Sequence, residues 1–311
     1  AFVITGIFIL PDTPLSIFTL LAVLQFVKYF QYEKNKHLLL AGLFTGLAML
    51  SKYSGVFVWV GVGLYVIIYA RKEFKNPFLY LSVLISAVCM LPVLIWNLNN
   101  DFISFTFHGG RVGFFGDFHP EYFLTEIIGE LGYNNPVNYV LIIISLVALI
   151  KGKNFIADMP KRLILCLSLP LILLFWFFSL TREILPHWTA PSFILLLIFV
   201  AAQLADKYEV KDENVIIPKS IVVSLSVLMI TLILGVTEIK TGFIPLNFSE
   251  RSKTVQRYGE GDFTLDMYGW RKIKPEFQEI RQDAIGNDLM KESDGMIALK
   301  WYPLANFDYY R

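Results

Sequence analysis

The chain has 311 residues, of which 55% are hydrophobic and only 17% are charged, and its mean hydropathy is positive. About a quarter of the residues of a soluble domain are charged, so this composition excludes an ordinary soluble protein and predicts an integral membrane protein. The formal net charge of +1 gives no reason to expect nucleic acid as a partner, and the positions of the basic residues are more informative than their total.

The two ends of the sequence predict a fragment of a longer protein. The chain begins inside an apolar run and stops at Arg311, shortly after a strand-like segment. Residues 1–10 are too few to cross a bilayer, which takes about 20 residues, and they lack the basic start and cleavage site of a signal peptide. We therefore expect them to form the outer half of a helix that begins before Ala1.

Eight further apolar segments follow, which with the partial first helix predict an all-α polytopic membrane bundle of about nine segments. Several segments are shorter than a full span, which favours tilted or half-length helices inside a bundle. Cys89 and Cys166 lie within two of these segments and are interpreted as membrane-buried thiols. The eight segments cover residues 13–30, 38–50, 55–70, 78–97, 136–150, 163–180, 189–204 and 220–236.

The connecting loops predict the orientation. One set of loops holds twelve lysines and arginines, whereas the alternate set holds only Lys52, Arg111 and Arg182. The positive-inside rule therefore places the first set in the cytoplasm. Asp12, Lys52, residues 98–135, residues 181–188 and everything after residue 236 are then expected on the outer face. The twelve are Lys34, Lys36, Arg71, Lys72, Lys75, Lys151, Lys153, Lys161, Arg162, Lys207, Lys211 and Lys219.

Residues 237–311 have the composition of a soluble segment. The three-to-four-residue repeat of apolar side chains over residues 273–285 predicts a helix, and residues 296–301 predict a strand. We therefore expect a transmembrane domain over residues 1–236, followed by the start of a small α/β extracytoplasmic domain over residues 237–311.

Lys52 is the first candidate functional residue, because it ends a short apolar helix and is followed by a second apolar segment. An ammonium group at membrane depth is costly unless it reaches an interface, a water-filled cavity or an anionic partner. Binding a lipid phosphate is one explanation, and snorkelling to the outer headgroups is the other. Gly42 and Gly46 form a small-residue pair that favours close packing of this helix on a neighbour.

Asp12 lies between two apolar segments, in Pro11-Asp12-Thr13-Pro14. Asp12 or Thr13 is well suited to cap the following helix, and Pro14 suits its first turn. An acidic residue at the mouth of a membrane helix is also a candidate functional carboxylate. It could orient an acceptor hydroxyl or bind a metal ion.

The two long outer connections hold the remaining candidates. Residues 98–135 contain His108 and Arg111, and the turn at residues 181–188 contains Arg182, His187 and Trp188. The arginines could contact phosphate or carboxylate, or Arg111 could be an interfacial anchor. His187 and Trp188 could contact a substrate or form part of an aromatic belt.

The second half of the first connection predicts an amphipathic helix lying in the membrane interface. Its apolar side chains alternate at helical spacing with Glu121, Glu126 and Glu130. The sequence contains no metal-ligand spacing, nucleophile elbow, phosphate loop or dinucleotide fingerprint. The cofactor is therefore unknown, with a divalent metal as a possible one.

An ordered set of motifs resembles bacterial GT-C glycosyltransferases. The nearest group is the protein-mannosyltransferase-like family, which includes aminoarabinose and galacturonic acid transferases acting on lipid A and its core. The resemblance covers nearly the whole chain, although no single motif is specific. It rests on residues 11–15, residues 40–53, Trp96-Asn97, residues 104–107 with Arg111, residues 186–191 and residues 266–270.

This resemblance implies transfer of a sugar, with inversion, from a polyprenyl-phosphate donor to a lipid, glycan or protein acceptor at the outer face of the bacterial inner membrane. Asp12 matches the family's second acidic position, and Lys52 matches a Ser/Thr-Lys position at the end of a short helix. The main catalytic carboxylate would precede Ala1, so we expect the fragment to be inactive alone. From the chemistry of the residues in this chain, we expect Lys52 and Arg111 to bind the phosphate, with Arg182 or His187 as the next candidates. We expect His108, His187 and Trp188 to contact the acceptor or the donor.

Other classes remain open at this level. A transporter or lipid flippase predicts charged residues throughout the membrane and related half-repeats, whereas the unusual residues here collect on one face. A polysaccharide polymerase or ligase predicts an arginine-rich outer loop, but residues 98–135 contain only Arg111 as arginine. A non-catalytic membrane scaffold would follow if the upstream loop carries no acidic residue.

Overall fold

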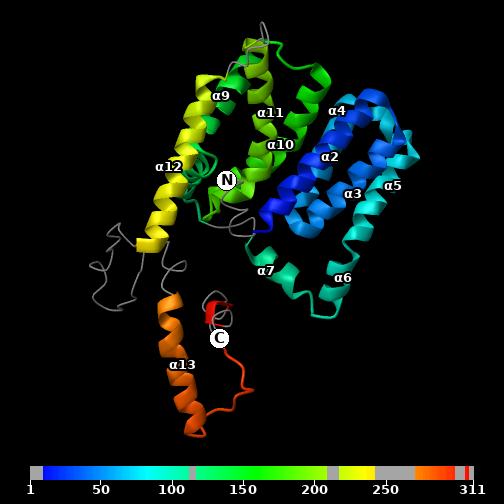
Figure 1. Cartoon of the computed structure of the whole chain (residues 1–311). Helices are drawn as coiled ribbons and strands as arrows, with labels where there is room; N and C mark the ends of the chain where they lie inside the picture. The colour runs from blue at the N-terminus through cyan, green and yellow to red at the C-terminus, as the bar shows by residue number, and fades with distance from the viewer. Residues whose placement is uncertain (1–9, 112–116, 209–216, 242–269, 298–304, 308–311) are drawn as a thin grey trace. The chain divides into compact units, whose positions relative to one another are not determined.

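The computed structural model describes residues 10–111, 117–208, 217–241, 270–297 and 305–307 (Figure 1). All regular elements within these ranges are helices, as expected for a membrane bundle. The chain divides into two units, Ala1–Leu225 and Ser226–Arg311. The partial helix expected over residues 1–10 falls almost entirely outside the described residues, so it stays a prediction.

Each of the eight complete apolar segments expected from the sequence coincides with one helix or, in one case, with two consecutive helices. The elements are α2 (Asp12–Tyr32), α3 (Asn35–Ser51), the 3-10 helix η1 (Tyr53–Val56), α4 (Phe57–Tyr69), the 3-10 helix η2 (Arg71–Lys75), α5 (Pro77–Cys89), α6 (Leu91–Leu98), α7 (Ile103–Arg111), α8 (Pro120–Tyr133), α9 (Pro136–Ile150), α10 (Asp158–Ser179), the 3-10 helix η3 (Pro186–Thr189), α11 (Ala190–Lys207), α12 (Lys219–Thr241) and α13 (Trp270–Gly286).

Several of these helices fit a multi-pass membrane protein. Among the described residues, four are long and apolar enough to cross a bilayer: α2, α10, α11 together with η3, and α12. Two bent pairs raise the number to six if each is one span, with bends of 47° between α5 and α6 and 105° between α8 and α9. Large apolar side chains such as Leu84 and Leu173 remain exposed on the helices, as lipid contact requires. The count of nine segments stays a prediction.

The contact between α3 and α5 confirms the role expected for the two glycines. A Cβ atom on Gly42 would lie 2.3 Å from the backbone oxygen of Ser82, and one on Gly46 would lie 2.9 Å from the Cα atom of Ser86. The Ser86 hydroxyl donates a 2.5 Å hydrogen bond to the carbonyl of Gly42. The absence of side chains on the glycines therefore lets the two backbones approach closely, as in other small-residue membrane helix pairs.

The main hydrophobic core lies where α10 packs against α4, α11 and α2. Phe26, Leu163 and Phe199 are completely buried in it. A Cβ atom on Gly61 of α4 would lie 2.5 Å from the Cα atom of Leu167, so α4 and α10 also meet at a glycine. Cys89 and Cys166 are free thiols, and Cys166 is buried.

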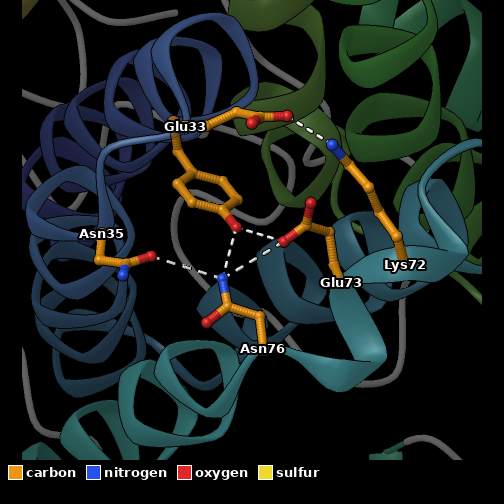
Figure 2. Close-up of polar contacts among 6 residues, drawn as sticks. Glu33, Asn35, Lys72, Glu73 and Asn76 are labelled. Carbon is orange, nitrogen blue, oxygen red and sulfur yellow. Dashed lines mark hydrogen bonds and ion pairs between the residues drawn. The ribbon is translucent and has the colours of Figure 1, made fainter.

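A polar network closes one end of the α2–α3 hairpin (Figure 2). Glu73 accepts a short hydrogen bond from the Tyr29 hydroxyl and a 3.4 Å bond from the Asn76 amide. The same amide also donates to the Tyr29 hydroxyl at 2.6 Å and to the Asn35 side chain at 3.4 Å. The buried carboxylate of Glu73 therefore has hydrogen-bond donors from two side chains.

The basic loops meet at this same end. Lys72 forms an ion pair with Glu33 (Figure 2), and the two side chains are 69% and 67% exposed. The hydrogen bond and the charge of Lys72 lower the pKa of Glu33 below its ordinary value. Arg162 lies 5.0 Å from the ring centroid of Tyr69. Loops from three parts of the sequence thus gather where the positive-inside pattern expects a shared face.

The C-terminal unit contains the helix expected over residues 273–285, which is α13. Phe307 packs against this helix, with its ring centroid 5.4 Å from that of Trp270 and 4.6 Å from that of Phe277. Met296 and Ile297 are not in a strand, and the rest of the strand expected over residues 296–301 lies outside the described residues. The α/β domain and the boundary at residue 236 therefore stay predictions.

Candidate functional site

Asp12 and Lys52 form an ion pair at the other end of the α2–α3 hairpin. Asp12 is the first residue of α2, and Lys52 directly follows α3. The Lys52 Nζ atom lies 2.7 Å from Asp12 Oδ1, and the two side chains are 25% and 5% exposed. The hairpin thus joins residues 40 positions apart into a largely buried pair, which the sequence identified as two separate candidates.

The structure tests one of the two interpretations of Asp12, that of a helix cap. The N-cap position of α2 is Pro11, and no side chain caps the helix by a hydrogen bond. The interpretation of Asp12 as a side-chain cap is therefore wrong, because its carboxylate accepts from Lys52 instead. Pro14 does lie in the first turn, where its missing N–H costs no helical hydrogen bond.

The backbone conformation directly after α3 determines the position of Lys52. Lys52 is extended, with φ −160° and ψ 138°, and the chain then folds back as η1 over the last turn of α3. A Cβ atom on Gly55 would lie 2.5 Å from the carbonyl carbon of Ala48, so only glycine fits this reversal. Lys52 does not simply snorkel outward, since one of its three N–H groups is directed to Asp12.

His187 and Tyr133 lie near the Asp12–Lys52 pair. The charges of Lys52 and Asp12 both act on the His187 imidazole. The His187 and Tyr133 ring centroids are 5.8 Å apart, and the charge of Asp12 also acts on Tyr133. The Tyr133 hydroxyl is buried and has no hydrogen-bond partner among the described residues. We call Asp12, Lys52, Tyr133 and His187 the Lys52 cluster.

Helix α8 holds η3, and therefore His187, in position. A Cβ atom on Gly129 would lie 2.2 Å from the Pro186 ring, so the two elements are in direct contact. Glu130 is completely buried. It accepts hydrogen bonds from the Thr189 hydroxyl at 2.6 Å and the Trp176 indole at 3.0 Å. Two hydrogen bonds to a buried carboxyl group thus connect α8 to η3 and α10.

The prediction of an interfacial amphipathic helix with its carboxylates in water is wrong for two of the three glutamates of α8, because Glu126 and Glu130 are buried. Glu126 is only 1% exposed, whereas Leu124 and Ile128 are 60% and 59% exposed. Both carboxylate oxygens of Glu126 are buried without a hydrogen-bond partner among the described residues. The sequence analysis did not select Glu126, Glu130 or Tyr133 as site residues. Their spacing of four and then three residues, which places them on one helix face, was the available signal.

Two other predicted site residues lie close by in the sequence but in different settings. The Trp188 ring packs 5.3 Å from that of Phe175, beside the buried cluster that includes Phe178 and Ile184. Trp188 therefore has a packing role in addition to any substrate contact. Arg182 is partly buried just after α10, and its backbone N–H donates to the Phe178 carbonyl at 3.1 Å.

His108 and Arg111 belong to α7, and their side chains lie outside the described residues. Helix α7 itself is tied to η1 directly after Lys52. The Ser104 hydroxyl lies 3.0 Å from the Tyr53 hydroxyl and donates a 2.6 Å hydrogen bond to the buried Asn97 side chain. These contacts bring Tyr53, Asn97 and Ser104, which belong to different motifs of the resemblance, next to one another. The roles of His108 and Arg111 stay predictions.

Metal binding has little support in the part of the chain that the structure describes. No three His, Cys, Asp or Glu side chains gather there as metal ligands would. Asp12 already accepts a hydrogen bond from Lys52. A divalent metal therefore stays a hypothesis about a site completed by other residues.

Comparison with known proteins gives two matches. Residues 1–96, which include Asp12 and Lys52, match the family described as dolichyl-phosphate-mannose-protein mannosyltransferase. The lipid A galacturonosyltransferase RgtD of Rhizobium johnstonii is 22% identical over 196 residues, which are 61% of this chain and 40% of the relative's own length. No solved structure matches the chain. Both matches are to glycosyltransferases, so the chain is similar to proteins of this class over part of its length.

Proposed function

We propose that the chain is the part of a membrane glycosyltransferase that binds the lipid-linked donor. The complete enzyme would move a sugar from a polyprenyl-phosphate donor to a lipid, glycan or protein acceptor at the outer face of the bacterial inner membrane. The buried Asp12–Lys52 ion pair is the observation that carries this proposal. It lies at the end of the hairpin opposite the basic loops, which supports an outer location.

In this proposal Lys52 stabilises the charge that develops on the departing lipid phosphate. A preorganised cation is effective there because it needs no reorientation during the reaction. Asp12 fixes the direction of the ammonium group, and the 25% exposure of the Lys52 side chain leaves room for a second anionic partner. Asp12 would also orient the acceptor hydroxyl.

The remaining predicted residues complete the proposed site. Arg111 and Arg182 would supply further cations for the phosphate, and His108, His187 and Trp188 would contact the donor or the acceptor. We assign no catalytic base, because the resemblance places the main carboxylate before Ala1. The name of the Rhizobium relative makes lipid A the first acceptor to test. The charged candidate residues collect at the end of the α2–α3 hairpin that holds Asp12 and Lys52, which favours this enzyme over a transporter or lipid flippase.

The experiment compares Lys52→Met with Lys72→Met in the complete protein that contains this chain. Both changes remove a lysine from an ion pair with a carboxylate, but the pairs lie at opposite ends of the hairpin. We expect Lys52→Met to lower kcat/KM for sugar transfer about 100-fold, the usual loss when one charge-stabilising group is removed. Lys72→Met should retain full transfer.

Binding of undecaprenyl phosphate separates phosphate recognition from a general loss of structure. We expect Lys52→Met to weaken this binding in the folded protein, and also to lower the melting temperature of the detergent-solubilised protein below that of Lys72→Met, because it leaves the buried Asp12 carboxylate unpaired. Unchanged transfer and unchanged binding in Lys52→Met would show that Lys52 does not bind the donor phosphate.

A further inference from the structure

Glu126 is a buried acidic residue whose carboxyl group has no hydrogen-bond partner among the described residues. Its side chain is 1% exposed, and neither carboxylate oxygen has a hydrogen-bond partner in the described part of the chain. Glu130, one turn later, has donors from both Thr189 and Trp176. Buried carboxylates in native proteins are nearly always paired or hydrogen-bonded. A carboxylate that is buried but unpaired is therefore a candidate ligand-binding group.

Tyr133 extends this observation along the same face of α8. Its hydroxyl is a second buried polar group with no partner among the described residues, and its ring lies 5.8 Å from that of His187. Glu126 and Tyr133 are seven residues apart, which is about 10 Å along a helix. The face of α8 thus offers an unused acceptor at Glu126 and an unused hydroxyl beside the Lys52 cluster. A sugar and its attached phosphate are long enough to reach both.

We propose that Glu126 belongs to a sugar-binding subsite that accepts hydrogen bonds from a sugar bearing no carboxylate of its own. This inference rests on the proposed function, since it places the sugar beside the phosphate that Lys52 would bind. Hydroxyl groups of a neutral sugar would supply the donors that Glu126 lacks. The Tyr133 hydroxyl, which both donates and accepts, would bind the same ligand nearer to the phosphate.

The carboxyl groups of Glu126 and Glu130 predict that the subsite binds a neutral sugar more tightly than a uronic acid. A uronic acid at this place would bring a third carboxyl group beside Glu126 and Glu130 in a poorly solvated region, where like charges repel and the three groups cannot all stay ionised, so binding would require the uptake of a proton. Such repulsion is a common source of specificity. The subsite should therefore reject galacturonic acid, the sugar for which the Rhizobium galacturonosyltransferase is named.

The test uses the complete protein and three probes: undecaprenyl phosphate, the same lipid carrying galactose, and the same lipid carrying galacturonic acid. The two sugars differ only in the oxidation state of C6. We expect the wild-type protein to bind the galactosyl lipid at least tenfold more tightly than the galacturonosyl lipid. Glu126→Gln should reduce this ratio to about one and leave the binding of undecaprenyl phosphate unchanged. Glu121→Gln, an exposed acid on the same helix, should keep the ratio.

The outcomes separate this inference from the proposed function. If Lys52→Met leaves the binding of undecaprenyl phosphate unchanged, the proposed phosphate site is wrong whatever Glu126 does. If the wild-type protein binds the two sugar lipids equally, or prefers galacturonic acid, the subsite is wrong even if Lys52 binds phosphate. A Glu126→Gln variant that melts at a higher temperature and keeps both the wild-type ratio and the wild-type KM for a neutral glycan acceptor would show that Glu126 is only a buried structural residue. If Glu126→Gln does not fold, the binding of the galactosyl and galacturonosyl lipids by the wild-type protein tests the inference by itself.

The same variants show which substrate supplies the sugar. If Glu126→Gln changes the ratio for the donor lipids, the subsite holds the donor sugar. Should the donor ratio stay at the wild-type value while the KM for a neutral glycan acceptor rises about tenfold, the subsite holds the acceptor sugar. No change in either quantity overturns the inference.

Discussion

The two ends of the α2–α3 hairpin are both polar, but they differ in how completely their groups are paired. At one end, Glu73 is buried and accepts from Tyr29 and Asn76, while Asn76 also reaches Asn35 (Figure 2). At the other end, the Asp12–Lys52 pair lies near the Tyr133 hydroxyl, which has no hydrogen-bond partner within the described ranges. Farther along α8, the carboxylate of Glu126 also lacks a partner among the described residues.

This difference helps to separate polar groups that stabilise the fold from polar groups that are available to bind a ligand. A fully paired buried network stabilises a single arrangement, and losing one member leaves the others unsatisfied. An unpaired buried group adds nothing to stability, so its presence calls for another explanation. Variants at the Glu73 end should therefore change the stability of the protein, whereas variants at the Lys52 end should change transfer and binding.

The largest effect on stability is expected for Glu73→Ala. The Tyr29 hydroxyl and the Asn76 amide would lose a buried acceptor, which should lower the free energy of unfolding by about 2 to 3 kcal/mol. Thermal unfolding in detergent measures this change. Transfer per folded molecule should stay at the wild-type level. A clear fall in the transfer rate of the folded fraction would contradict the division between the two ends.

Thr189→Val tests the connection between α8 and η3. The substitution keeps the shape of the side chain but removes the donor to Glu130, so a buried carboxylate would retain only the Trp176 hydrogen bond. We expect a loss of roughly 1.5 to 2 kcal/mol in stability together with weaker transfer, because η3 carries His187. Thr125→Val, whose hydroxyl donates at the exposed surface of α8, is the matched control and should change neither quantity.

Gly129→Ala should act on transfer more than on folding. The added Cβ atom would meet the rigid Pro186 ring at 2.2 Å, so η3 must shift away from α8. A small displacement of His187 should lower kcat/KM about tenfold, equivalent to about 1.4 kcal/mol. Gly132→Ala on the same helix is the control, because a Cβ atom there has no neighbour within 4 Å. Equal activity in the two alanine variants would mean that the position of η3 does not limit transfer.

The smallest effect is expected for Glu33→Gln. Both side chains of the Glu33–Lys72 pair are mostly exposed, and exposed ion pairs contribute little because water and salt screen them. The melting temperature and the transfer rate should both match those of the wild-type protein at pH 7. A fall in either would show that the network around Glu73 extends to the exposed pair.

Sequence patterns alone were enough to predict the class of protein and the positions of most helices. Long apolar runs can satisfy their backbone polar groups in a membrane only as helices, which is why each complete predicted segment coincides with one helix or a bent pair. The glycines of α3 were also predictable, because Gly42 and Gly46 lie on one helix face and allow close approach. Asp12 and Lys52 stood out because charged residues are rare at the ends of such runs.

Only the tertiary structure shows which of these residues contact one another. The sequence left Asp12 as a cap or a functional carboxylate, and the hairpin then brought Lys52 within 2.7 Å of it. The interfacial orientation predicted for α8 was wrong for two of its glutamates, because an amphipathic pattern defines two faces without stating which one is buried. Packing against η3 and α10 turned Glu126 and Glu130 inward. Contacts between distant segments depend on the packing of the whole bundle, and a local pattern does not contain that information.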